Sequence, residues 1–152
     1  MTSPAAASLG APSGESYPAI AASVAIARRA VGRRLHALPE DALMIGDVEL
    51  AVSEACTNVV LHAYRDREVG VFRVVVQRAV GLVRVTVSDD GSGMKPRPDS
   101  PGLGLGLPTM AALTDHLDVG TAGDGTGTVV SMHFSAAGAH ARLSSPRRPG
   151  RG

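Results

Sequence analysis

Two polar residues with complementary chemistry, Glu54 and Asn58, stand four residues apart in a largely apolar stretch of the chain. Helical spacing would place both side chains on one face, with His62 one turn further along the same stripe. The amide oxygen of Asn58 suits Mg²⁺, which prefers oxygen ligands and keeps waters and substrate phosphates. Glu54 could then accept a proton. The alternative is a solvated polar pair on a surface helix, so the pair needs support from other motifs.

A second group of residues, Asp89, Gly91 and Gly93, follows a segment in which valines alternate with polar residues. That alternation predicts a half-buried strand over 82–88 that delivers the Asp89 carboxylate to its end. A carboxylate held there can accept a hydrogen bond from the exocyclic amine of adenine, and the glycines let the backbone approach a base without a side-chain clash. The alternative is an ordinary turn after a strand.

A third group is the glycine run Gly102, Gly104 and Gly106, which leads directly into a segment where Pro108 suits the first turn of a helix. Exposed backbone amides and the positive end of a helix favour phosphate. An isolated run of this kind is explained equally well by a flexible loop. The order of the three motifs therefore matters more than any one of them.

The elements that must position these residues are predicted by the periodicity of the chain. The expected strands span 15–18, 71–77, 82–88, 117–121 and 126–134, and the expected helices span about 24–38, 40–64 and 107–116. This order predicts an α+β two-layer sandwich, with a mixed, largely antiparallel sheet and helices on one face. A Rossmann fold fits less well, because it needs strands and helices to alternate throughout.

Composition narrows the function classes. A chain of 152 residues is long enough for one core, with a net charge of +1 and only two Tyr and two Phe. These values do not indicate a nucleic-acid surface or an aromatic stacking platform. The lone lysine, Lys95, does not complete the spacing of a phosphate-binding P-loop.

The ends of the chain differ from its middle in composition. Residues 1–14 and 138–152 are rich in small residues, proline and glycine, and we expect both to be disordered around a folded domain at 15–137. The C-terminal tail is basic, and solvation explains that charge more simply than a phosphate-rich partner. Cys56 has no second cysteine to pair with, and no apolar run reaches the roughly 20 residues of a membrane span. A cytoplasmic location is expected.

Taken together, the order E-x-x-x-N, D-x-G-x-G and G-x-G-x-G, followed by Gly127-Thr128 in the last expected strand, resembles the GHKL superfamily with its Bergerat (HATPase_c) fold. Within that superfamily, the segment 47–64 is similar to the anti-sigma-factor serine/threonine kinases of the RsbW and SpoIIAB family.

The resemblance implies a role for each matching position. Glu54 would be the catalytic base, Asn58 the ligand of Mg²⁺ and Asp89 the acceptor for adenine. The other nucleotide-binding positions implied are Gly91, Gly93, Met94, Gly102, Leu103, Gly104, Leu105, Gly106 and Thr128. Strand periodicity agrees for Thr128, which is in phase with Val130 and should face the core. Arg28 matches a partner-contacting arginine of the family, with a solvated helix face as the alternative.

The function implied by the resemblance is a partner-switching kinase that uses ATP and Mg²⁺. It would phosphorylate a serine of an anti-anti-sigma protein of the STAS type and sequester an alternative sigma factor. A homodimer is also implied, with no direct contact to nucleic acid or membrane. Histidine-kinase chemistry fits less well, because no dimerising hairpin with a phosphoacceptor fits before Glu40.

One departure from the family pattern is the segment 95–101, which is short, rich in proline and lacks a basic residue directly before the glycines. Lys95 or Arg97 could replace that residue, but a stiff segment would hinder closure over phosphates. A non-catalytic module that binds a regulator under nucleotide control is therefore the alternative function.

Overall fold

The computed structural model describes residues 9–37, 40–93, 106–123 and 125–145 of the chain. Its elements, in chain order, are β1 (Ser13–Pro18), α1 (Ala21–His36), α2 (Ala42–Asn58), a π-helical turn η1 (Val59–Ala63), β2 (Val71–Ala79), β3 (Leu82–Asp89), α3 (Gly106–Leu113), β4 (His116–Thr121), β5 (Thr128–Ser135) and α4 (Ala136–Ser144). The expected α+β class is confirmed. The strands form one sheet in the order β1-β2-β3-β5-β4, and each of these pairings is antiparallel.

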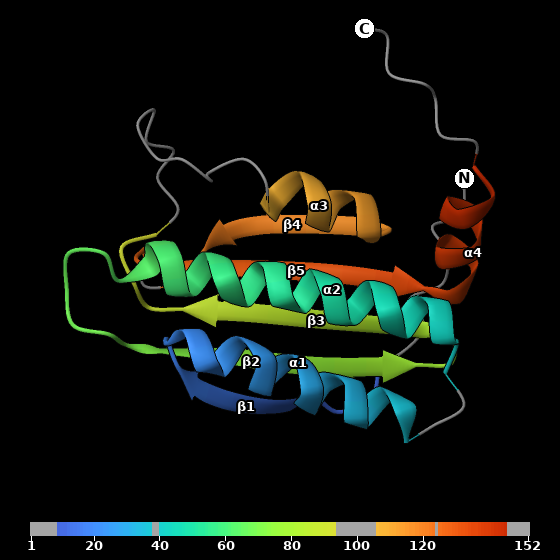
Figure 1. The fold of residues 1–152 in the computed structure, drawn as a ribbon, viewed down its shortest axis with the longest axis horizontal. Helices are drawn as coiled ribbons and strands as arrows, with labels where there is room; N and C mark the ends of the chain where they lie inside the picture. The colour runs from blue at the N-terminus through green and yellow to red at the C-terminus, as the bar shows by residue number, and fades with distance from the viewer. Residues whose placement is uncertain (1–8, 38–39, 94–105, 124, 146–152) are drawn as a thin grey trace, which may run out of the picture.

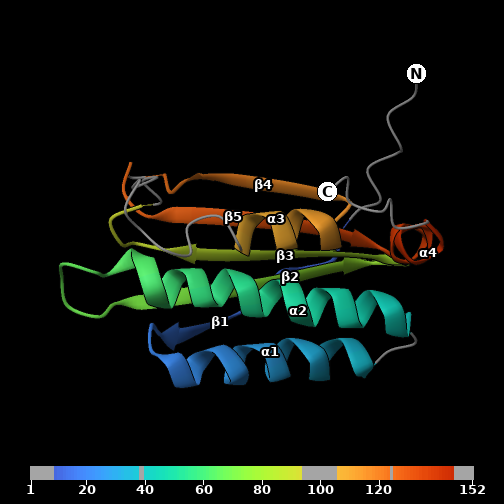
Figure 2. The same ribbon diagram turned by 45° about the horizontal axis from the view of Figure 1, so that its top comes forward.

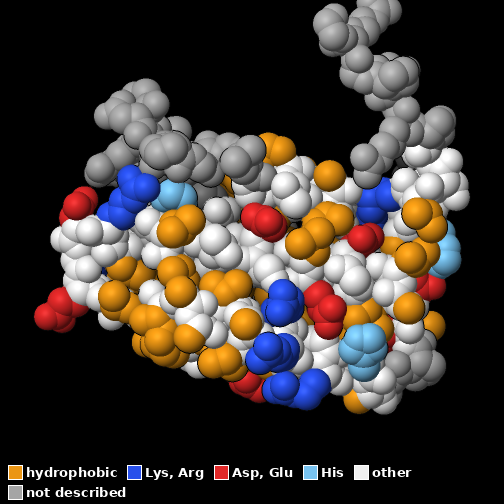
Figure 3. Space-filling model, viewed as in Figure 1, with side chains coloured by type: hydrophobic (Ala, Val, Ile, Leu, Met, Phe, Trp, Pro, Cys, Tyr) orange, Lys and Arg blue, Asp and Glu red, His pale blue; other side chains and the backbone are white. Residues whose placement is uncertain are grey.

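The molecule has two layers, because α1, α2 and α3 lie on one face of the sheet while α4 packs beside one end of it (Figures 1 and 2). The core lies between these layers. In β3 the buried positions are Val83, Val85, Val87 and Asp89, and in β5 they are Thr128, Val130, Met132 and Phe134. The predicted alternation therefore holds in both strands. Figure 3 shows the helical face, where basic side chains gather over α1.

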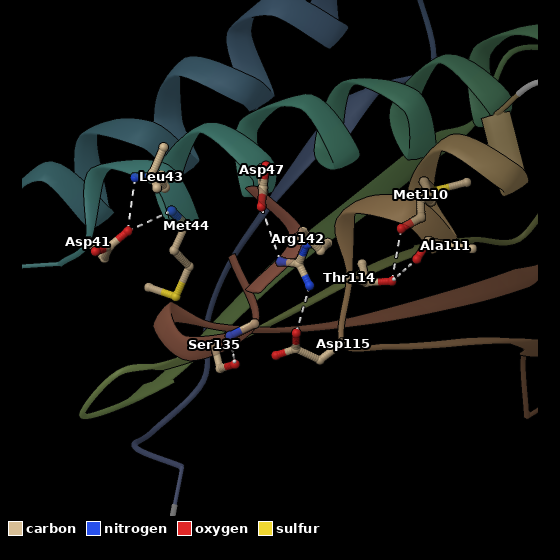
Figure 4. Close-up of polar contacts among 11 residues, drawn as sticks. Asp41, Leu43, Met44, Asp47, Met110, Ala111, Thr114, Asp115, Ser135 and Arg142 are labelled. Atoms are coloured by element: carbon tan, nitrogen blue, oxygen red, sulfur yellow. Dashed lines mark hydrogen bonds and ion pairs between the residues drawn. The ribbon is translucent and has the colours of Figure 1, made fainter. Parts of the chain in front are cut away.

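Helix α2 begins with a side-chain cap and ends in an irregular turn. The carboxylate of Asp41 accepts hydrogen bonds from the backbone N–H groups of Leu43 and Met44, at 3.0 and 3.1 Å (Figure 4). The sequence predicted one helix over 40–64, but the α-helical part stops at Asn58 and η1 follows. Single π-helical turns often occur at functional sites.

The expected disordered tail from residue 138 is wrong over its first part, because α4 is folded and docked. Its N-cap Ser135 accepts from Gly138 N at 3.0 Å, and Ala139 is buried. The Arg142 guanidinium donates to the carboxylate of Asp47 in α2 at 3.1 Å and to that of Asp115 at 2.8 Å (Figure 4). These contacts extend the folded region to Ser144. The small residues of this segment do not predict them.

Smaller differences occur at other boundaries. The strand β1 starts at Ser13, ahead of the expected residue 15, and Gly10 N already donates to Arg78 O at 2.7 Å. Helix α3 ends at Leu113, ahead of the expected residue 116, and the Thr114 hydroxyl donates to Met110 O at 2.8 Å. Among the helices described, none is long and apolar enough to cross a membrane.

Candidate functional site

A pocket opens where the C-terminal end of α2 and the turn η1 face the end of β3 and the start of β5. Its empty volume is about 310 Å³, including space open to solvent. Aliphatic side chains form much of the wall, namely Ala55, Val59, Ala63, Val87 and Val130. Four polar side chains interrupt that wall, namely Asn58, His62, Asp89 and Thr128. An apolar pocket with a few convergent polar groups is typical of a small-molecule site.

Asp89 is the buried acceptor of this pocket. It ends β3 directly opposite Thr128 of β5, and the exposed fractions of the two residues are 8% and 6%. Its Oδ1 accepts a hydrogen bond from Gly91 N at 2.9 Å. Burial raises the pKa of Asp89, while hydrogen bonds from the backbone amides of Gly91 and Thr128 oppose that rise. The side chain is therefore a desolvated acceptor beside an aliphatic cavity.

The glycines around Asp89 are required by the packing of the protein itself. A Cβ on Gly91 would collide with the carbonyl oxygen of Ala63, and a Cβ on Gly127 would collide with that of Asp89. Gly93 and Gly127 also adopt positive φ angles of 78° and 77°. The sequence explained Gly91 by the approach of a ligand, whereas the structure shows that its nearest neighbour is the η1 backbone.

Asn58 lies where the pocket meets the N-terminus of α3. A Cβ added to Gly106, the first residue of α3, would be 2.8 Å from Asn58 Nδ2 and 2.9 Å from Oδ1. The structure thus brings together two residues that are far apart in sequence and that the motifs predicted to share a site. Helix N-termini favour anions, so this corner is suited to phosphate.

The other predicted residues are not all in the pocket wall. Glu54 is half-buried on α2, one turn before Asn58, and does not line the pocket. Arg28 is exposed on α1, also outside the pocket. Gly93 and Thr128 line it. The remaining predicted positions, Met94, Gly102, Leu103, Gly104 and Leu105, lie outside the described residues.

His62 is a pocket residue to which the sequence assigned no ligand role, although its place on the stripe of Glu54 and Asn58 was visible. It lies in η1, and its Nε2 is buried with no hydrogen-bond partner among the residues that the structure describes. Burial lowers the pKa of His62, and the charge of Arg65 lowers it further. Buried polar atoms nearly always have a hydrogen-bond partner. A ligand in the pocket could supply it.

Comparisons with known proteins agree with this geometry. The family described as "Histidine kinase-like ATPase domain" matches residues 17–134. The chain is 34% identical over 123 residues to the anti-sigma F factor of Clostridium beijerinckii, an alignment that covers 73% of this chain and 86% of that protein. It is 36% identical over 104 residues to an anti-sigma F factor of Clostridium botulinum, covering 61% of this chain and 73% of that one.

A solved structure supports the same fold. The RsbU and RsbW domains of a Mycobacterium tuberculosis protein match with a TM-score of 0.64 and 23% identity, covering 83% of this chain and 32% of that chain. At this identity the likeness shows the fold alone. The family match and the curated relatives show more, and the chain therefore belongs to the histidine kinase-like ATPase domain family, within the RsbW and SpoIIAB group of anti-sigma factors.

Proposed function

We propose that this chain is an ATP-dependent protein serine kinase that also acts as an anti-sigma factor. The observation that carries the proposal is the buried Asp89 carboxylate, which faces an aliphatic pocket beside Asn58 and the N-terminus of α3. An acceptor at one end and a phosphate-favouring helix end at the other match the two ends of ATP.

The residues present fit the adenine end of ATP. Asp89 accepts from the backbone amides of Gly91 and Thr128, and a carboxylate has about four lone-pair positions, so it can still accept from the exocyclic amine. Aliphatic side chains such as Val87 and Val130 would contact the faces of the base. Thr128, directly opposite Asp89 in the sheet, would complete the pocket.

The residues near α3 fit Mg²⁺ and phosphate. Among the described residues, no group of three or more His, Cys, Asp and Glu could hold a metal ion alone. A magnesium ion would therefore depend on the amide oxygen of Asn58 together with phosphate and water oxygens. Mg-ATP would supply the γ-phosphoryl group, and Glu54 would accept the proton of the attacking serine hydroxyl.

The proposed partners follow from the relatives, two of which are anti-sigma F factors. We propose an alternative sigma factor as the sequestered partner and a STAS-type anti-anti-sigma protein as the phosphorylated one. Arg28 is exposed on α1, and basic side chains gather over that helix (Figure 3), which supports a role in partner contact. A homodimer and a cytoplasmic location belong to the same proposal.

The test is transfer of label from γ-labelled ATP to a purified STAS-type antagonist. We expect acid-stable phosphoserine with the unaltered protein and with the control Glu68→Gln, which changes an exposed carboxylate. Glu54→Gln should abolish transfer while leaving ATP affinity within about twofold, since Glu54 does not line the pocket. Transfer that persists in Glu54→Gln would rule out Glu54 as the base.

The position of Glu54 outside the pocket wall also favours a second candidate, a module that binds its regulator under nucleotide control without transferring phosphate. That candidate predicts ATP-dependent capture of a sigma factor with no labelled antagonist. Capture and labelling measured on the same preparation separate the two functions.

A further inference from the structure

Tyr64, the residue that follows the turn η1, is buried with 7% of its surface exposed. Its hydroxyl donates to Asp90 Oδ1 at 2.5 Å, and Asp90 N donates to the same hydroxyl oxygen at 3.4 Å. The carbonyl oxygen of Val71 lies 3.1 Å from that hydroxyl. Burial raises the pKa of Tyr64 to about 12, with the Asp90 hydrogen bond acting in the same direction. The phenol therefore stays protonated and able to donate.

The Tyr64 ring is held in place from both sides. A Cβ on Gly70 would collide with ring atom Cε1, so the backbone at Gly70 packs directly on the ring. The Arg67 guanidinium carbon lies 5.9 Å from the ring centroid, and Arg67 Nη1 donates to Asp90 O at 3.4 Å. The connection between η1 and β2 thus fixes both the tyrosine and the residue that it holds.

A neighbouring set of contacts attaches the loop of residues 90–92 to the turn η1. Ser92 N donates to Ala63 O at 2.8 Å, and Gly91 packs against that carbonyl. Residues 90–92 are therefore attached to the last residue of η1 and to Tyr64. Asp89 comes immediately before this anchored stretch, and its Oδ1 takes a hydrogen bond from Gly91 N. The carboxylate is also bonded by the backbone amide of Thr128 in β5, so its direction depends in part on where the anchored loop lies.

We propose that Tyr64 is a positioning residue for base recognition, which holds Asp90 so that Asp89 presents its carboxylate to the adenine amine. The inference rests on the proposed nucleotide-binding function and adds a determinant of base specificity to it. Asp90 is itself exposed, so losing the tyrosine hydroxyl returns the Asp90 carboxylate to water. Tyr64→Phe should therefore fold.

The experiment compares the binding of ATP and of inosine triphosphate, which lacks the exocyclic amine, by titration calorimetry. We expect the unaltered protein to prefer ATP. Tyr64→Phe should weaken ATP binding about five- to tenfold and inosine triphosphate binding less than about twofold, so the preference falls. The matched control is Tyr17→Phe, which removes a similar hydroxyl that donates to Glu15 at 2.6 Å in β1. Both affinities should stay unchanged in this control.

A second pair of variants keeps the test independent of the tyrosine. Asp90→Ala should reproduce the Tyr64→Phe effect, and the double variant should be no worse than either single one. Asp90→Asn retains an acceptor for the tyrosine and should keep the ATP preference. An unchanged preference in Tyr64→Phe, or equal weakening of both nucleotides, would overturn the inference alone. Failure of the unaltered protein to bind ATP would instead overturn the proposed function beneath it.

Discussion

Substituting Asp89 by Asn should move stability and nucleotide affinity in opposite directions. Because burial raises the pKa of Asp89, the folded state takes up its proton more readily than the unfolded chain does. The free energy of unfolding therefore falls as pH rises from the unfolded pKa, about 3.9, through the raised folded value. Above the folded pKa the buried charge lowers stability in full. The amide of the Asp89→Asn variant carries no charge, so this variant should melt at a higher temperature.

The same change should weaken ATP binding. Either the new amide group faces the adenine amine, so that two donors meet, or the side chain flips and its donor faces a backbone amide, that of Gly91 or Thr128, from which Asp89 now accepts. One buried polar contact is mispaired in both cases. A mispaired contact costs about 1–3 kcal/mol, which is roughly a five- to 150-fold rise in Kd.

Titration calorimetry gives the affinity, and thermal melts at neutral pH give the stability. The matched control is Asp118→Asn, which changes an exposed carboxylate on β4 that pairs with His116 at 3.0 Å. We expect that control to leave ATP binding unchanged. Two results for the Asp89 variant would refute the reasoning: unchanged ATP affinity, or a lower melting temperature that accompanies the loss of binding.

Three further changes test the surroundings of the site. Gly106→Ala should push the Asn58 amide aside and weaken Mg-ATP binding about tenfold in calorimetry. Its control is Gly46→Ala, where the new Cβ meets open space. That control should raise the unfolding free energy by about 0.5–1 kcal/mol and leave binding unchanged. His62→Phe should flatten the loss of stability below about pH 6.5 in denaturant titrations, because the lowered pKa of His62 makes its protonation oppose folding. Arg142→Met should lower the unfolding free energy by about 1–2 kcal/mol through loss of two ion pairs, with no effect on ATP affinity. An Arg142 variant with the stability of the unaltered protein would show that α4 is held by its apolar contacts alone.

The sequence predicted the parts of the site that depend on local periodicity. The period of two in β3 placed Asp89 at a strand end, and the same period in β5 turned Thr128 toward the core. The helical spacing of Glu54 and Asn58 identified the α2 stripe. Local patterns succeed here because each of these positions is fixed by the phase of its own element.

Features that depend on distant contacts could not be predicted in this way. The α-helix ends at Asn58, where it gives way to a turn whose last carbonyl accepts from Ser92, a residue beyond the next two strands of the chain. Likewise, α4 is folded through Arg142, whose partners Asp47 and Asp115 come from two other parts of the fold. Neither set of contacts leaves a pattern within its own segment.

The residues proposed to meet the ligand and those that shape the pocket follow different physical rules. Burial of Asp89 disfavours the charged form of its carboxylate, and the proposed binding role would explain why a carboxylate is kept there. Gly127 instead permits the close approach of its chain to the Asp89 carbonyl, a contact that the fold needs whether or not a ligand is present. In its proposed role Tyr64 connects the two, because its hydrogen bond to Asp90 would use the packed turn to aim the Asp89 carboxylate. If that connection holds, affinity can be lost at Tyr64 without loss of fold, and stability can be gained at Asp89 without gain of function, whereas a substitution at Gly127 must change both together.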